Sequence, residues 1–136
     1  MSSIRPAPPA QAAIDEELAR ASALLAEGRL GEAAGAYARC EVALSHEKSP
    51  RRAEVLTCLA RIVKDSVGPR DASPLLDLAI VVSPSHRGAV HERLAIAHAL
   101  EEHAVAARVG LLAHGLAESE TERLARLEAV VHDALL

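Results

Sequence analysis

A spacing of 34 residues recurs along this chain and limits the folds that are open to it. Ser49-Pro50 and Ser83-Pro84 lie 34 residues apart, and Leu44, Leu78 and Leu112 follow one another at the same interval. Each interval has room for two helices of about four turns with short turns between them. One such pair cannot bury its apolar faces alone, so neighbouring pairs must stack. The spacing therefore predicts a row of similar helical hairpins.

Composition favours an all-α fold. The 136 residues include 29 alanines and 19 leucines, with no Phe, no Trp and a single Tyr. Ala and Leu are among the strongest helix formers, whereas a sheet of this size normally contains more β-branched and aromatic residues. The length suits about one domain with its own core. We expect a flexible Pro/Ala-rich segment at residues 1–12 and one helical repeat domain at residues 13–136.

Apolar residues at helical spacing predict about seven helices. The expected spans are 13–27, 30–45, 51–66, 75–82, 87–102, 104–116 and a last helix that begins at Ser119. Ser119 and Glu122 form a capping box, which is a helix-start signal. The segment 75–82 is apolar on nearly all sides, so it is expected to be the most buried helix.

This helix-turn-helix period resembles the tetratricopeptide repeat. Residues 24–33 followed by Tyr37 are similar to the family's turn, small residue and aromatic. The second repeat is carried by Leu56, Leu59, Ala60, Val63, Asp71, Ala72, Leu76, Ala79 and Pro84. Residues 88–116 fit a third repeat more loosely, and the segment from Ser119 looks like the family's capping helix. The resemblance covers roughly residues 14–135 and implies an α-solenoid of antiparallel hairpins; a seven-helix bundle of another connectivity is the alternative.

Charge and hydropathy argue against several classes of function. A net charge of −4 and a pI near 6.0 disfavour a surface that follows nucleic-acid phosphates, and Tyr37 is the only aromatic on which a base could stack. No run of residues approaches the ~18 apolar positions of a membrane span, and the N-terminus lacks the apolar stretch of a signal peptide. We expect a cytoplasmic protein with no nucleic-acid and no membrane partner.

Few residues suggest chemistry. His91, His98 and Glu102 lie on one predicted helix and could form a surface metal site. However, seven residues separate the two rings by about 10 Å along the axis, so solvated or groove-lining histidines are the preferred interpretation. Cys40 and Cys58 accompany apolar stripes and are expected to be buried, inert thiols; a nucleophilic Cys–His pair is the alternative. The chain is therefore expected to be no enzyme, with no catalytic residues, metal or cofactor.

What remains is a surface for a partner. In the resembled family, the first helix of each repeat lines a concave groove. The candidate partner-binding residues on those faces are Ser22, Thr57, Arg61, Lys64, His91, Ala95, His98 and Glu102. Arg61 and Lys64 would favour an acidic or C-terminal peptide, because Arg can bind a carboxylate through two hydrogen bonds. The family's clamp for chaperone C-termini is not present, because the chain has no Asn and only two lysines.

The expected function is an adaptor or scaffold that binds a partner peptide or helix in this groove. One alternative is a self-assembly module that forms a homodimer through its C-terminal helix, which carries Val130, Val131, Leu135 and Leu136. Another is a regulatory domain of a larger protein.

Overall fold

The computed structural model describes residues 9–117, 128 and 131–132. These residues contain six principal helices and no strand, which confirms the all-α prediction. The helices are α1 (Pro9–Ala26), α2 (Leu30–Ala43), α3 (Pro50–Ser66), α4 (Pro69–Val82), α5 (Arg87–Ala99) and α6 (His103–Ala117). The predicted helix from Ser119 lies outside the described residues, except for helical positions 128, 131 and 132. None of the described helices is long and apolar enough to cross a bilayer.

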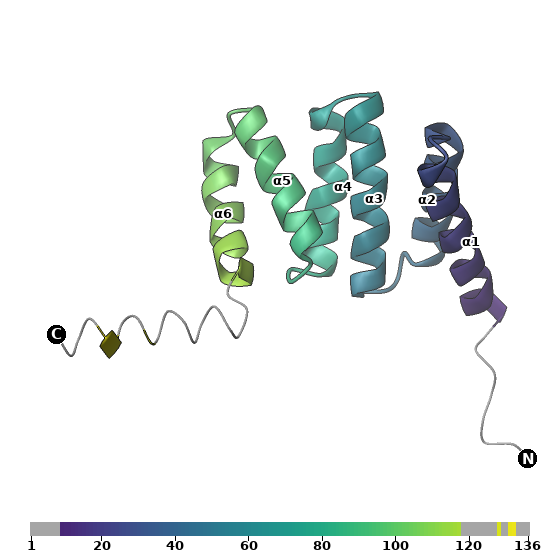
Figure 1. Cartoon of the computed structure of the whole chain (residues 1–136), viewed down its shortest axis with the longest axis horizontal. Coiled ribbons are helices and arrows are strands. Elements are labelled where there is room, and N and C mark those ends of the chain that lie inside the picture. Colours follow the sequence, from purple (N-terminus) through teal and green to yellow (C-terminus); the bar gives the residue numbers. More distant parts are fainter. Residues whose placement is uncertain (1–8, 118–127, 129–130, 133–136) are drawn as a thin grey trace, which may run out of the picture.

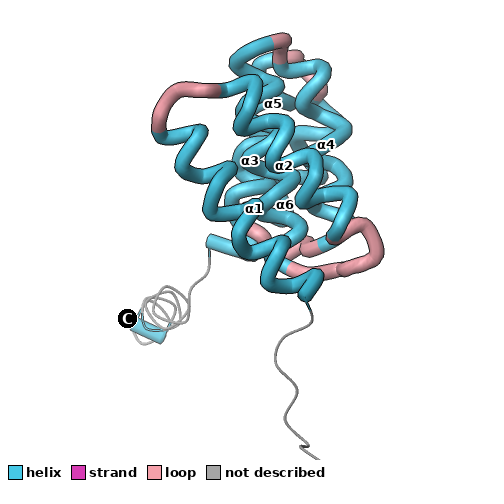
Figure 2. Tube along the Cα trace, turned by 90° about the vertical axis from the view of Figure 1, so that its right-hand side faces the viewer, coloured by secondary structure: helices cyan, strands magenta, loops and turns pink. Residues whose placement is uncertain are grey.

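The helices stand side by side in the order of the sequence (Figure 1), and each packs mainly against its neighbours along the chain. Successive helices run in opposite directions, so that α1 and α2, α3 and α4, and α5 and α6 form three tightly packed hairpins. The hairpins meet through α2 with α3, α4 with α5, and α3 with α5. Figure 2, seen from the side of the first hairpin, shows the connecting loops gathered at the two ends of the helices.

Local signals explain where several helices begin and end. Ser49 caps α3, since its side chain accepts a hydrogen bond from the backbone nitrogen of Arg52 at 3.2 Å, and Pro50 follows in the first turn. Gly28 has a φ of 76° between α1 and α2, a conformation that favours glycine. His86 caps α5 through its Nδ1, which accepts from the backbone nitrogen of Ala89 at 3.1 Å.

Three predicted boundaries are wrong. Helix α1 begins at Pro9, four residues before the predicted start, and α4 begins at Pro69, six residues before it. Pro74 lies inside α4. The neighbouring Ser73 hydroxyl donates to the carbonyl of Pro69 at 3.1 Å. Helix α5 ends at Ala99 rather than at residue 102.

In the described part of the chain, the core consists mainly of small and aliphatic side chains, which form three clusters. Several alanines are fully buried, and such small side chains let helix backbones approach closely. They include Ala21, Ala33, Ala53, Ala72, Ala79, Ala89 and Ala97. Helix α4 is not buried on all sides as predicted, because Val81 is 68% exposed. It packs through one stripe containing Leu76 and Val82, and its outer face has no neighbouring helix in the described part of the chain.

Candidate functional site

An open cleft of about 430 Å³ lies where α1, α2 and α3 meet. Its lining is mostly apolar and consists of Leu18, Ser22, Leu25, Tyr37, Arg51, Glu54, Val55 and Cys58. Helices α1 and α3 are not among the closely packed pairs, although α3 and α5, the corresponding helices one hairpin further on, are in contact. The cleft therefore occupies the space that a tighter approach of α1 to α3 would close.

The sequence directs these side chains into the cleft by helical spacing. Leu18, Ser22 and Leu25 are separated by four and three residues on α1, so they share one face. Glu54 and Cys58 share a face of α3 for the same reason. Tyr37 comes from α2 and is buried. Its burial, with Cys58 and Glu54 nearby, raises the pKa of Tyr37 to about 12, so the phenol is neutral at physiological pH.

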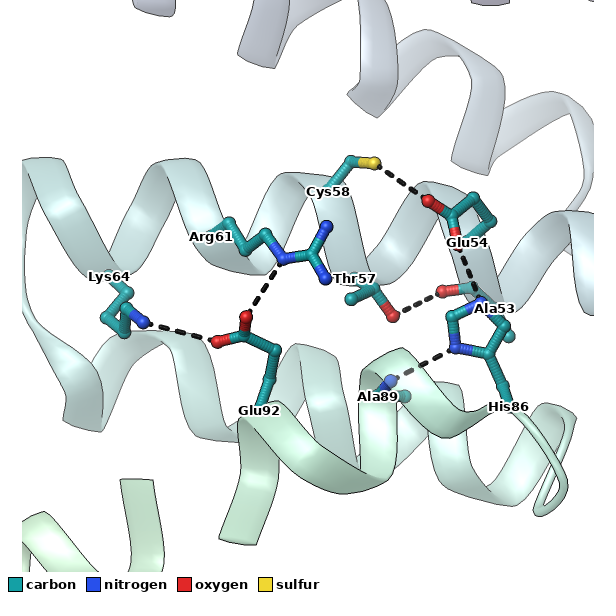
Figure 3. Close-up of polar contacts among 9 residues, drawn as sticks. All are labelled: Ala53, Glu54, Thr57, Cys58, Arg61, Lys64, His86, Ala89 and Glu92. Atoms are coloured by element: carbon teal, nitrogen blue, oxygen red, sulfur yellow. Dashed lines mark hydrogen bonds and ion pairs between the residues drawn. The ribbon is translucent and has the colours of Figure 1, made fainter. Parts of the chain in front are cut away.

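A chain of polar contacts leads from the cleft to the next hairpin (Figure 3). The Cys58 thiol donates to Oε1 of Glu54 at 3.4 Å, and Oε2 of Glu54 lies 2.7 Å from Nε2 of His86. Because Nδ1 of His86 already accepts a backbone N–H from Ala89, the imidazole holds its proton on Nε2 and donates it to Glu54. Burial and the neighbouring Glu54 raise the pKa of Cys58, so this residue is a thiol rather than a thiolate.

Arg61 and Lys64 meet a carboxylate of their own chain. Nε of Arg61 donates to Oε1 of Glu92 at 3.0 Å, and Nζ of Lys64 donates to Oε2 at 3.2 Å (Figure 3). Burial raises the pKa of Glu92, but the hydrogen bonds and charges of Arg61 and Lys64 outweigh it and hold that pKa below its usual range. The structure thus brings Arg61 and Lys64 together, but both bind Glu92 of the same chain and so link α3 to α5.

The structure separates the other predicted site residues. Ser22 is exposed and lines the cleft, whereas His91, Ala95 and His98 are exposed on α5 and do not line it.

The expectation that Thr57 lies on an exposed face is wrong. Its side chain is 0% exposed, and its hydroxyl donates to the carbonyl of Ala53 at 2.7 Å. Helix α3 packs against α2, α4 and α5 at once, so it buries more of its surface than one apolar stripe.

Glu102 lies in the turn after α5 rather than on the helix itself. Oε1 of Glu102 accepts from Nη1 of Arg93 at 2.9 Å, and Nε of Arg93 donates to Oδ1 of Asp77 at 2.8 Å. Arg93 is buried, so these contacts form a structural ion-pair network that joins α4, α5 and the turn before α6. Hydrogen bonds from Arg93 hold the pKa of Glu102 below its usual range.

Neither cysteine is in a disulfide, and Cys40 is buried as predicted. Cys58 is only partly buried, because it faces the cleft. Among the described residues, no three His, Cys, Asp or Glu side chains are grouped so that they could hold a metal ion.

The sequence interpretation missed Glu54, Tyr37 and His86 as neighbours of the cleft. The four-residue spacing of Glu54 and Cys58 indicates that the two side chains share one face of α3. This spacing is the sequence feature from which the α3 residues of the cleft could be predicted.

The lowered pKa of Glu92 predicts acid sensitivity. Relative to the protonated acid, the ionised form of Glu92 is more stable in the folded chain than in the unfolded chain. The ionised group therefore stabilises the fold above about pH 4.5, and this stabilisation is lost as pH falls. We expect Glu92→Gln to lower the free energy of unfolding by about 1 kcal/mol at pH 7. The difference from wild type should shrink below about pH 4, as measured by urea unfolding across pH. The same difference at every pH would contradict this assignment.

Comparison of the chain with models of known families, with curated proteins and with solved structures found no match.

Proposed function

We propose that this chain is a non-catalytic adaptor with a tetratricopeptide-like solenoid of three helical hairpins. It binds a peptide or helix of a partner protein on the side formed by α1, α3 and α5. Support for the architecture comes from the 34-residue period together with the sequential packing of α1 with α2, α3 with α4, and α5 with α6. Arrays of this kind bind through extended surfaces rather than through a catalytic centre.

The proposed function rests mainly on the cleft between α1 and α3. Its volume of about 430 Å³ is in the range of ligand-binding pockets, and its lining is mostly apolar with a few polar groups. Leu25 remains partly exposed within it, although the same helix buries Ala21 and Leu24 completely or nearly so. A partner that inserted an apolar side chain here would remove this surface from water, which is the main source of binding free energy in such grooves.

The cleft is a better contact site than the pair Arg61 and Lys64. Both cations already contact Glu92. A carboxylate from a partner would have to displace Glu92 and leave its half-buried charge without a cation, which costs free energy. We therefore place the main contact in the cleft and leave Arg61 and Lys64 as links between hairpins.

A library of random 12-residue peptides displayed on phage provides the test. Peptides selected on the wild-type chain are measured against two arginine variants of α1. Ser22→Arg projects a long charged side chain into the cleft, whereas Ala23→Arg adds the same charge at an exposed neighbour that does not line it. We expect Ser22→Arg to weaken binding at least about tenfold and Ala23→Arg to change it less than about twofold.

The two variants also define the contrary result. Both should unfold at similar temperatures, because both positions are exposed. Equal binding by the two variants would place the contact outside the cleft, and failure to select any peptide would count against the adaptor function.

A homodimer is the second candidate function. Leu111 and Val131 are exposed toward the C-terminal end of the described residues, and exposed aliphatic groups favour association when they form one patch. Sedimentation over a range of concentrations separates a dimer from a monomeric adaptor.

A further inference from the structure

Among the described residues that line the cleft, Arg51 and Glu54 are the charged ones, and Arg51 alone of the two pairs with side chains of opposite charge. The guanidinium of Arg51 contacts Oδ1 of Asp15 at 3.1 Å, Oε1 of Gln11 at 2.6 Å and Oε1 of Glu47 at 3.5 Å. Arg51 therefore ties the start of α3 to α1. Its positive charge is offset by two carboxylates of the same chain, so it offers little attraction to an acidic ligand.

Glu54 is the other charged residue of the lining. Its side chain is 57% exposed, and within the described residues its polar contacts are the imidazole of His86 and the thiol of Cys58. Neither cancels its charge, because His86 donates from Nε2 as a neutral ring and Cys58 is protonated. Within the described residues, no lysine or arginine forms an ion pair with Glu54.

This arrangement differs from that of the other carboxylates between the hairpins. Glu92 is bound by Arg61 and Lys64, and Glu102 is bound by Arg93. Glu54 thus combines a negative charge, access to solvent and a place in the lining of an apolar cleft. Charge complementarity between such a group and a ligand raises specificity and the rate of association.

We propose that the cleft selects a segment of a partner protein that carries an apolar side chain with a lysine or arginine within about one helical turn of it. The apolar side chain enters among Leu18, Leu25 and Val55, and the cation binds the carboxylate of Glu54. The apolar contact supplies most of the affinity, and the ion pair at the edge supplies specificity. This inference rests on the proposed function, and it replaces the expected acidic partner with a basic and apolar one.

The test uses the peptides selected on wild type whose binding is lost in Ser22→Arg. We expect these peptides to be enriched in Lys or Arg next to an apolar residue, compared with the unselected library. Glu54→Gln should weaken their binding about fivefold, and the loss should shrink at high salt. Glutamine keeps the size of the side chain and can still accept a hydrogen bond from His86, so the fold should be retained.

Glu16→Gln is the matched control. It removes the same charge from an exposed position on α1 that does not line the cleft, so it reports the effect of net charge alone. Equal weakening by both glutamine variants would overturn the inference, as would selected peptides that are acidic or lack a cation. A dimer of this chain that Ser22→Arg dissociates would also overturn it, since the occupant would then be a second copy. If no selected peptide responds to Ser22→Arg, the proposed cleft function itself fails.

Discussion

Leu76→Ala is expected to lower the free energy of unfolding by about 3 kcal/mol. The Leu76 side chain is 1% exposed and lies in the cluster that joins α3, α4 and α5, with Leu56 and Ile96 in the same cluster. Removing three carbon atoms loses buried apolar surface and leaves a cavity that the surrounding helices can fill only in part. Urea unfolding followed by circular dichroism measures the change.

Leu78→Ala in the same helix is the control. Leu78 is 37% exposed, and it lies in the same helix, two residues after Leu76. Its expected cost is less than about 1 kcal/mol, because less apolar surface is lost from the core. Equal costs for the two variants would contradict the packing of α4 through a single stripe.

Arg93→Ala is expected to cost about 2–3 kcal/mol. The Arg93 side chain is 4% exposed and donates to both Asp77 and Glu102. Its loss leaves two neighbouring carboxylates without their cation and removes the buried aliphatic stem. Both carboxylates are partly exposed and can regain water, so the cost lies below that of a fully buried ion pair.

Arg61→Ala provides the comparison for Arg93. Arg61 also bonds to a carboxylate on another element, but about half of its side chain is exposed. We expect that substitution to cost about 1 kcal/mol or less. Equal stability of the two variants in thermal and urea unfolding would show that Arg93 does not clamp α4, α5 and the following turn.

Much of the helical pattern could be predicted from the sequence, because each helix has a continuous apolar stripe. The predicted spans for α2 and α3 differ from the observed ones by two residues or fewer at each end. The start of α4 could not be placed correctly, since proline is normally tolerated only in the first turn of a helix and Pro74 therefore favours a start close to residue 75. Pro74 has no backbone N–H to donate, but α4 tolerates this loss because Leu76 and Val82 bury the helix against the core.

The candidate site was harder to predict because it depends on distances between helices. Periodicity placed Ser22 on an exposed face, and Ser22 does line the cleft. The cleft itself results from the looser approach of α1 to α3, which no local pattern reveals. Thr57 was misplaced because α3 has three neighbouring helices. Glu92 was missed as the partner of Arg61 because the two are 31 residues apart in sequence.

Protection of Cys58 from a thiol reagent shows directly whether a bound peptide occupies the cleft between α1 and α3, since this thiol lines the cleft. The experiment compares the rate of maleimide labelling with and without a saturating concentration of a selected peptide. Cys40 is the internal reference, because it is 1% exposed and reacts only when the fold opens. We predict that the peptide slows labelling of Cys58 by about tenfold more than that of Cys40. An unchanged rate at Cys58 with the peptide bound would contradict binding in the cleft between α1 and α3.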